Sequence, residues 1–581
     1  MSNGAGKPKP AFFVAILVVV LGLIGFAYMR FTKKKEEAAG GAGSGSQFVD
    51  PRKAGGGSGS AAKTAENPDP NAPPTTETKY EWEPAQRLPE VKGTASYKDL
   101  GKPRVVKFAV NVWAGWAPIV WANRGSAAKK VWKDTKGGEF QVELVLIDDP
   151  VLMGDTVANG NVHIGWATVD MLPLIVQRLK RDPRTMPRVY QQIDWSNGGD
   201  GIVARDSVKD VAALRGKTVV LAQNSPSHYF LMNMLLNAGV NLTEVTVRPV
   251  KTPFQAAAAF NQNKDIAAAV SWAPDIYNLT KPGTGNKMLV STVEANKLIA
   301  DVWFARADFG RDHPEIVEGL VRGILDAVEE LQTEQNKDAV AKMLDDFYNL
   351  PKGTGKSMLG DAHWTNYAEN REFFLVGSNP TNFERTYDTA NLLYKQINMI
   401  DEKVPFDKLV DFSIIKKLGA EEKYATQKST YEFKFTPANP EKINVESAVI
   451  TKTVVIKFFP NSYEVFHKVK GPGGDVYYDG NVDYTIEEIA KLAGQFGAAR
   501  IVIEGHTDAS MKGIADEQLV KDLSQRRANS VKEALVNKFK MNPAQFSVAG
   551  YGWSKPADEN DPGNHAKNRR VEVKVVPAEA Q

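Results

Sequence analysis

The chain of 581 residues contains no cysteine and only seven histidines. Without cysteine it has no disulfide, no thiolate metal ligand, no cysteine nucleophile and no lipid-modified N-terminal cysteine. The histidines are scattered and lack the HExxH or paired spacing of zinc enzymes, so we expect no metal site. The sequence also lacks a GxSxG motif, a Walker-type phosphate loop and a framed carboxylate pair. We therefore expect neither catalytic residues nor a cofactor.

The chain has almost no excess of charge of either sign: it contains 72 Lys and Arg residues and 69 Asp and Glu residues, for a net charge of +3. No run rich in Lys and Arg is interleaved with aromatic residues, which argues against a nucleic-acid partner. Hydrophobic residues make up 43% of the chain, enough for ordinary packed cores. Because a single core rarely serves more than about 250–300 residues, we expect several domains.

One long hydrophobic run follows a short N-terminal tail (1–10). Residues Ala11–Met29 carry no charge, and as a helix they would span about 28 Å, close to the ~30 Å hydrocarbon core of a bilayer. We expect a retained transmembrane helix over 11–31. The alternative is a signal peptide cleaved near Gly25-Phe26-Ala27. Because the run lacks Asp and Glu, it predicts a tether in the lipid bilayer and not half of an ion channel.

Residues 32–90 are rich in Gly, Ser, Ala, Pro and charged residues, notably in the runs 40–46 and 68–74. Such a composition buries too little apolar surface to offset chain entropy, so we expect a disordered linker. A flexible chain of this length has a mean span of roughly 40 Å, which would hold the folded parts away from the bilayer.

From residue 103 onward, short runs of β-branched residues alternate with amphipathic segments, the pattern of an α/β sheet domain. The predicted strands are Val105–Val112, Val142–Ile147, His163–Trp166, Gly201–Ala204, Thr218–Ala222, Thr246–Val250 and Ala267–Ser271. The predicted helices are Ala117–Ala122, Met171–Leu179, Ser227–Ala238 and Gln255–Asn261.

In open α/β sheets, ligands bind beyond the carboxyl ends of the strands, so residues adjoining the predicted strands are candidates for binding a solute. These are Trp113, Trp116, Thr168, Asp170, Asp200, Ser225, Ser227, Trp272 and Asp275. Ser225-Pro226-Ser227 opens a predicted helix, whose free N–H groups and dipole suit an anion. Some of these residues also have a simpler interpretation: the serines as helix caps, the tryptophans as core or interlobe packing, and the neighbouring His228 as a structural residue.

This candidate set contains three aspartates and neither Arg nor Lys. Carboxylates and aromatic faces suit a cation, whereas the helix terminus suits an anion. We therefore expect a small zwitterion or an amine-bearing acid, and not a plain inorganic anion.

The C-terminal part again alternates strands and helices. Its predicted strands are Val454–Phe459, Ala499–Glu504, Phe546–Ala549 and Val571–Val576, and its predicted helices are Thr485–Phe496 and Asp522–Lys540. Three motifs lie on this pattern: Gly505-His506-Thr507-Asp508, Leu523-Ser524-Gln525-Arg526-Arg527-Ala528, and Asn568-Arg569-Arg570-Val571-Glu572-Val573. Together they resemble the peptidoglycan-binding signature of the OmpA-like domain.

This resemblance implies that Asp508 and Arg527 bind a peptidoglycan stem peptide of the diaminopimelate type, supported by Thr507, Asn568 and Arg570. A carboxylate and a guanidinium a few ångströms apart suit the ammonium and the carboxylate of that side chain. Two features depart from the family pattern: Val520 stands where Asn is usual, and the segment 461–483 is longer than usual. Both bear on affinity or stem-peptide preference.

The middle of the chain carries a second resemblance. The phrases Val211–Val220, Asn224–Leu231, Val270–Asp275 and His313–Val317, in that order, resemble periplasmic solute-binding proteins of the nitrate, sulfonate, taurine and thiamine-precursor group. The resemblance implies two α/β lobes joined by a hinge, with the ligand between them. The expected fold is a type II periplasmic-binding-protein domain over 91–423, a connector over 424–447 and an α+β OmpA-like domain over 448–581.

These parts together predict a receptor in the inner membrane of a Gram-negative-type envelope, single-pass, with its body in the periplasm. Lys33, Lys34 and Lys35 after the hydrophobic run favour the opposite orientation, but the wall-binding motif requires an outside location. We expect a non-enzymatic receptor that binds a small anionic or zwitterionic solute, attaches to peptidoglycan and serves an ABC permease or a sensor. The alternatives are a membrane-to-wall tether whose receptor-like domain has lost its ligand, and an enzyme built on the two-lobed frame.

Overall fold

The computed structural model describes residues 73–435 and 443–577. The chain divides into two compact units, Met1–Ser58 and Gly59–Gln581, and the described residues all belong to the second unit. The expected tail (1–10), the expected transmembrane helix (11–31) and most of the expected linker lie outside the described residues.

The first lobe is built on a seven-stranded sheet with the order β12-β5-β11-β4-β1-β3-β2. Its strands are β1 (Val105–Val110), β2 (Trp132–Lys133), β3 (Glu139–Leu146), β4 (Ile164–Thr168), β5 (Pro187–Ser196), β11 (Ala300–Arg306) and β12 (Ala362–Trp364). Strand β1 runs parallel to β3 and β4, whereas β11 runs antiparallel to β4 and β5. Strands β4 and β11 are buried along their whole length, as expected for a sheet covered on both faces.

The second lobe has a five-stranded sheet with the order β10-β6-β9-β7-β8. Its strands are β6 (Asp200–Arg205), β7 (Thr218–Ala222), β8 (Thr246–Val250), β9 (Ala268–Trp272) and β10 (Asn286–Ser291). Strand β7 is parallel to β8 and β9, and β6 is antiparallel to β9 and β10. Each sheet thus contains a set of parallel strands. One strand next to a crossing, β11 in the first sheet and β6 in the second, runs antiparallel to both of its neighbours.

Helices cover both sheets. They are α2 (Ala117–Asn123), α3 (Pro150–Ala158), α4 (Leu172–Leu179), α5 (Pro226–Asn237), α6 (Pro253–Gln262), α7 (Asp275–Leu279), α8 (Ala307–Asp312), α9 (Pro314–Glu330), α10 (Glu334–Tyr348), α11 (Thr354–Met358), α12 (Tyr367–Leu375), α13 (Phe383–Gln396), α14 (Ser413–Leu418) and α15 (Glu422–Ala425). Helix α9 is amphipathic, and its buried side includes Ile316, Leu320 and Ile324.

The chain crosses between the lobes twice, from β5 to β6 and from β10 to β11. The two crossings contact each other: the hydroxyls of Ser196 and Thr292 lie 2.9 Å apart, and the Gly198 N–H donates to Thr292 Oγ1 at 2.9 Å. These crossings lie where the resemblance to solute-binding proteins implies a hinge, which stays a prediction.

The predicted strands and helices of this region recur in the structure, with Thr218–Ala222 and Thr246–Val250 matching β7 and β8 at both ends. The prediction omitted β2, β5, β10, β11 and β12. Two of these, β5 and β11, adjoin the crossings and carry buried polar side chains that interrupt a hydrophobic run, including Gln191 and Asp194.

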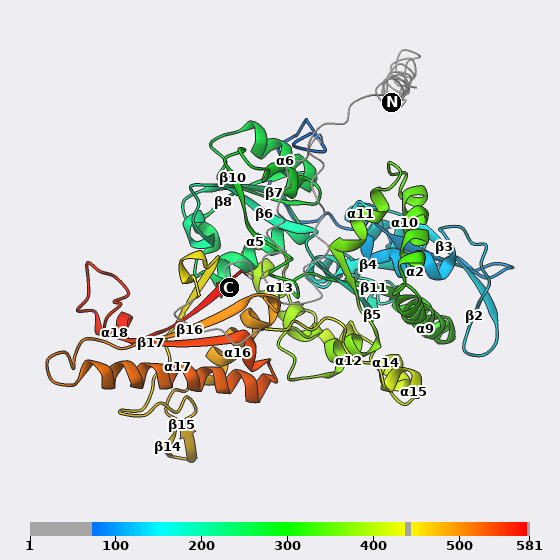
Figure 1. Ribbon diagram of the computed structural model, residues 1–581. Helices are drawn as coiled ribbons and strands as arrows, with labels where there is room; N and C mark the ends of the chain where they lie inside the picture. The colour runs from blue at the N-terminus through cyan, green and yellow to red at the C-terminus, as the bar shows by residue number, and fades with distance from the viewer. Residues whose placement is uncertain (1–72, 436–442, 578–581) are drawn as a thin grey trace, which may run out of the picture. The chain divides into compact units, whose positions relative to one another are not determined.

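The C-terminal domain has a four-stranded sheet with the order β13-β18-β16-β17 and a separate hairpin, β14–β15. Its elements are β13 (Ile450–Val454), β14 (Lys468–Gly471), β15 (Gly474–Tyr477), α16 (Val482–Gln495), β16 (Arg500–His506), α17 (Glu517–Phe539), β17 (Phe546–Gly552), α18 (His565–Asn568) and β18 (Val571–Val576). The long helix α17 lies along the sheet (Figure 1). The expected first strand over Val454–Phe459 was placed too late, because the pairing of β13 with β18 ends at Val454.

The C-terminal domain contacts the second lobe and the second crossing. The Lys297 N–H donates to the Gln495 carbonyl at 3.1 Å, the Ala498 N–H donates to Asn296 Oδ1 at 3.1 Å, and Arg385 forms a 2.9 Å ion pair with Glu487. A continuous hydrophobic core extends from the second lobe into this domain.

The expected disordered linker is wrong for its last part, residues 73–90, which pack on both lobes. Thr76 donates through its N–H and its hydroxyl to Asp275, at 2.6–2.9 Å. Trp82 bridges to Val250, and the Glu83 N–H donates to the Pro249 carbonyl at 2.9 Å. These backbone and carboxylate partners order a segment whose own composition is too polar to form a core.

Arg306 ties the N-terminal segment to the first lobe. Its side chain is fully buried, pairs with Asp308 at 2.7 Å and donates to the carbonyls of Ala95 and Ala158 at 2.7 and 3.2 Å. A buried guanidinium is stable only when all its donors have partners, which this arrangement supplies.

We predict that Arg306→Met lowers the free energy of unfolding by about 3–5 kcal/mol, because it leaves the Asp308 carboxylate buried without its cation. Arg311→Met is the matched control, since Arg311 pairs with Asp312 on the surface and its loss should leave the free energy of unfolding nearly unchanged. Urea unfolding measures both. Equal losses in the two variants would contradict the role given to Arg306.

Candidate functional site

Three polar residues stand in one row across the first sheet. On β11, Asp301 lies directly opposite Thr168 of β4 and directly opposite Asp194 of β5. Residues opposite each other in antiparallel strands have Cβ atoms about 4.5–5.5 Å apart on the same face, and like charges at such positions repel. All three are buried, so this row places two carboxyl groups together away from water.

Two further aspartates complete the group, which we call the four-aspartate cluster: Asp170, Asp194, Asp200 and Asp301. Asp170 follows β4 and is fully buried. Asp200 opens β6 in the second lobe, where it accepts a 2.7 Å hydrogen bond from the Ser196 hydroxyl. The charge of Asp200 acts on Asp170, Asp194 and Asp301, so the cluster spans the junction of the two lobes.

Burial dominates the protonation of the cluster. It raises the pKa of Asp170 to about 7, and it does the same for Asp200. The pKa of Asp194 is also raised by burial, and that of Asp301 is raised well above its ordinary value by burial and by the neighbouring Asp194. Near neutral pH, the cluster therefore retains protons that exposed aspartates would have lost.

The interactions that set these pKa values include no Lys or Arg among the described residues. Lys297, on the second crossing, interacts with Glu372, Glu369 and Glu432 instead. Several cluster oxygens have no hydrogen-bond partner of good geometry in the described part of the chain: both of Asp170 and one each of Asp194 and Asp200. The four carboxyl groups are thus either negatively charged or protonated, and some of their oxygens lack a hydrogen-bond partner among the described residues.

Aromatic side chains surround the cluster. Trp113 Nε1 donates to Asp194 Oδ2 at 2.9 Å, and the Tyr348 hydroxyl fixes Trp113 by donating to its carbonyl at 3.0 Å. Trp272 lies opposite Asp200 in the pairing of β6 with β9. Tyr229 on α5 and Tyr394 on α13 are fully buried, and the Asp170 charge raises the pKa of both beyond the effect of burial.

The structure therefore brings several of the residues expected to bind solute to this cluster: Trp113, Thr168, Asp170, Asp200 and Trp272. Ser227 lies at the start of α5, fully buried, and its hydroxyl has no partner among the described residues. His228 is structural, as expected: it accepts from the Asn224 N–H at 3.3 Å, packs on Tyr394, and has its pKa lowered to about 4 by burial.

Three expected solute residues lie elsewhere. Trp116 is fully buried in the first-lobe core, against Phe108, with its Nε1 donating to Asn111 at 2.7 Å. The Ser225 hydroxyl donates to the Ala222 carbonyl. The Asp275 carboxylate accepts hydrogen bonds from the N–H and the hydroxyl of Thr76. Sequence reasoning also missed Asp194 and Asp301, because it omitted the strands that carry them.

In the C-terminal domain, Asp508 follows β16 and is 7% exposed. Its carboxylate accepts from the Ser510 N–H at 2.8 Å and pairs with Arg569 Nη1 at 2.9 Å, while His565 Nδ1 lies 3.4 Å away. Burial alone would raise the pKa of Asp508, but the bonds from Ser510 and Arg569 hold it below its ordinary value. Asp508 is therefore an ionised carboxylate near the surface.

Arg527, on α17, is the expected basic partner. Its Nε donates to the Ser462 carbonyl at 3.1 Å, and its guanidinium carbon lies 4.8 Å above the Phe458 ring. Burial lowers the pKa of Arg527, and the charge of Asp508 opposes that shift. The two side chains are thus near enough to interact electrostatically, although the direct ion pair of Asp508 is with Arg569, which sequence reasoning did not select.

The three supporting candidates differ in position. Thr507 lies next to Asp508, and its N–H donates to the Gly552 carbonyl at 2.9 Å. Asn568 joins the Ala557 N–H to the Pro562 carbonyl and so holds the loop before β18. Arg570 is 5% exposed and bonds to Glu572 at 2.6 Å. Asn568 and Arg570 therefore shape the loop before the central strand β18, from which Arg569 reaches Asp508.

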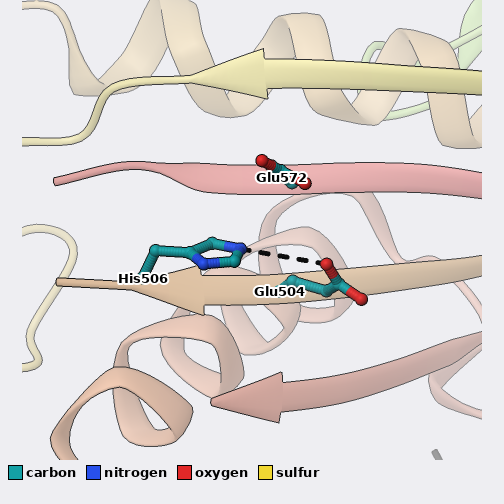
Figure 2. A group of neighbouring side chains, drawn as sticks. All are labelled: Glu504, His506 and Glu572. Carbon is teal, nitrogen blue, oxygen red and sulfur yellow. Dashed lines mark ion pairs between the residues drawn. The ribbon is translucent and has the colours of Figure 1, made fainter. Parts of the chain in front are cut away.

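Figure 2 shows a second charged group near this site, Glu504 and His506 on β16 and Glu572 on β18, whose ligand-type atoms lie within 4.8 Å of one another. Lys574 Nζ lies 2.7 Å from Glu504, and Arg570 already pairs with Glu572. Burial would raise the pKa of Glu504, but His506 and Lys574 lower it to about 2. Because cations of the chain neutralise both carboxylates, we assign no metal to this group.

Two family models match the chain. Residues 137–337 match the NMT1/THI5 like family, and residues 481–570 match the OmpA family. The chain joins an NMT1/THI5-like solute-binding domain to a C-terminal OmpA domain. Both resemblances drawn from the sequence motifs are thereby confirmed.

Curated relatives fall into the same two groups. The taurine-binding periplasmic protein of Escherichia coli is 26% identical over 240 residues, which is 41% of this chain and 65% of that protein. Outer membrane porin F of Pseudomonas aeruginosa is 36% identical over 91 residues, 16% of this chain and 25% of that protein. The chain spans less than two thirds of the length of these relatives.

Solved structures show weaker likeness. The periplasmic aliphatic sulphonate binding protein SsuA of Escherichia coli has a TM-score of 0.41 at 16% identity, covering 54% of this chain and 99% of that one. The desulfurization enzyme DSZB has a TM-score of 0.37 at 15% identity, covering 55% and 98%. At such TM-scores the likeness carries no argument about function. Within residues 73–435 and 443–577, no helix combines the length and apolar character needed to cross a bilayer.

We predict that the cluster makes the folded protein less stable as pH rises. The folded pKa of Asp170 is raised to about 7 from an ordinary 3.8, so its stabilising contribution is complete below pH 3.8 and disappears as pH rises through 7. Relative to wild type, Asp170→Asn should gain stability between pH 4 and 7, on the order of 4 kcal/mol for a shift of this size.

Urea unfolding at several pH values, with the exposed Asp346→Asn on α10 as control, tests this. The wild-type and Asp170→Asn curves should diverge with rising pH, whereas the control should follow wild type. Parallel curves for all three proteins would show that Asp170 ionises normally.

Proposed function

We propose that this protein is a receptor of the bacterial envelope, which binds a small anionic or zwitterionic solute between two lobes and attaches non-covalently to peptidoglycan. The observation that carries the proposal is the match of one chain to both family models, together with the buried aspartate oxygens of the first domain that lack hydrogen-bond partners among the described residues. The names of the relatives, a taurine-binding periplasmic protein and an outer membrane porin, support an envelope location. The relatives named as binding proteins favour a receptor over an enzyme.

Wall attachment is proposed to use Asp508 and Arg527. The ammonium of a diaminopimelate side chain would pair with Asp508, and its carboxylate would accept from Arg527, whose Nη atoms form no hydrogen bond with the described residues. Arg569 would then share Asp508 with the ligand or move away from it, since 58% of its side chain is exposed. Thr507, beside Asp508, offers a further hydroxyl.

We predict that Asp508→Asn and Arg527→Gln each reduce retention on purified sacculi by at least 10-fold, because each removes one of the two charged contacts proposed to hold the diaminopimelate side chain. Arg526→Gln is the matched control: it lies next to Arg527 on α17 but is exposed. Co-sedimentation with sacculi measures retention. Loss of retention in the control alone, or in none of the three variants, would reject this assignment.

We further propose that the hydrophobic segment at residues 11–31 anchors the chain in the inner membrane as a single-pass helix, with the body in the periplasm. The support is the uncharged run Ala11–Met29 within it, whose length is close to that needed to span a bilayer. The captured solute would pass to an ABC permease or a sensor. The second candidate function is a membrane-to-wall tether, favoured by the contacts that join the C-terminal domain to the second crossing.

A melting assay separates the receptor from the tether. A ligand present at 100 times its dissociation constant adds ~2.7 kcal/mol to the free energy of unfolding. We predict that at least one small zwitterion or sulfonate raises the melting temperature of the wild-type protein. A tether that has lost its ligand would show no shift with any member of a broad panel of such compounds.

A further inference from the structure

We propose that the four-aspartate cluster is a binding site for a protonated nitrogen bearing N–H donors, a primary ammonium or a guanidinium, on the captured solute. This inference rests on the proposed receptor function and deepens it, because it names the charged group that the solute must carry. It also assigns the binding to Asp194 and Asp301 as well as to Asp170 and Asp200.

The hydrogen-bonding state of the cluster favours a donor. Both oxygens of Asp170, one of Asp194 and one of Asp200 are buried acceptors without a partner of good geometry among the described residues. Carboxylates accept hydrogen bonds, and an ammonium supplies three donors while a guanidinium supplies up to five. A sulfonate or nitrate group has only acceptors, so it satisfies none of these oxygens.

The charge of the cluster favours a cation. Asp301 stands directly across from Asp194, and the charges of Asp170 and Asp200 act on it as well. Among the described residues, the interactions of these four carboxyl groups include no Lys or Arg. Buried charges in proteins are normally paired, so the group is balanced either by protons or by a cation from outside the chain.

Aromatic residues around the cluster complete the chemistry of a cation site. Trp113 donates to Asp194, Trp272 lies opposite Asp200, and Tyr229 and Tyr394 lie near Asp170. Aromatic faces attract ammonium and guanidinium groups. A quaternary ammonium would use these faces but would leave the carboxylate acceptors unsatisfied, which is why we assign N–H donors to the ligand.

Binding of such a cation must be coupled to proton release. The groups that face the cluster are the four aspartates themselves, Tyr229 of α5, Tyr394 of α13 and Tyr431 of the connector, together with the uncharged Thr168, Ser196 and Trp113. The tyrosines stay protonated at neutral pH because burial raises their pKa. The aspartates are therefore the groups that lose protons when a cation enters, and affinity rises with pH.

Calorimetry on the wild-type protein with two matched pairs of probes tests the proposal. Taurine and ethanesulfonate differ by an amine, and putrescine and choline are cations with and without N–H donors. We expect taurine or putrescine to bind at least 10-fold more tightly than its matched partner. That binding should strengthen between pH 6 and pH 8 and release protons, seen as a heat that depends on the ionisation enthalpy of the buffer.

Asp301→Asn keeps the shape of the side chain and should weaken this binding at least 10-fold, while Asp346→Asn should not change it. If ethanesulfonate binds as tightly as taurine, without proton release and unchanged by Asp301→Asn, the receptor function stands and the cation site is wrong. Equal binding of choline and putrescine would also overturn the assignment of N–H donors. If none of the four probes binds between pH 6 and pH 8, this inference is rejected, and the receptor function is then decided by the broad panel of the melting assay.

Discussion

The repulsion among four buried carboxyl groups is the interaction on which this account of the solute-binding domain depends. A folded chain tolerates such a group only where protons or a cation neutralise it. The strand register holds Asp194 and Asp301 face to face, and the crossing chain brings Asp200 from the second lobe toward Asp170 of the first. A cation bound there would hold the lobes together by replacing repulsion with attraction. Ligand capture and lobe closure would then be one electrostatic event.

The C-terminal site follows a different principle. Asp508 is kept ionised by hydrogen bonds and by Arg569, close to the surface, whereas Arg527 is held by a carbonyl and an aromatic ring. Because 58% of the Arg569 side chain is exposed, a ligand can compete with Arg569 for Asp508 without disrupting the fold. The neighbouring network of Glu504, Glu572, Lys574 and Arg570 links the two central strands β16 and β18 near this pair.

Much of the fold could be predicted from the sequence because its parallel strands are continuous hydrophobic runs. Strands β7 and β8 matched at both ends, and β18 did too. Strand β5 was missed because Gln191, Gln192 and Asp194 interrupt its hydrophobic pattern. Strand β11 was missed as well, so its Asp301 was not among the candidate site residues. Trp116 and Asp275 were chosen by their position after strands, but side-chain direction and the partner Thr76 depend on tertiary packing. Likewise, the motif at 568–573 does not reveal that Arg569, and not Arg570, reaches Asp508.

The ionisation of the cluster can be observed without knowing the ligand. Carbon-13 NMR of the wild-type protein labelled at the aspartate carboxyl carbons, with single Asn variants for assignment, reports the pKa of each group directly. The account predicts that Asp170 and Asp200 titrate near pH 7 in the unliganded protein, and that an amine-bearing ligand lowers both values. Titration of all four cluster carboxyls near the ordinary aspartate value of about 4 would contradict it.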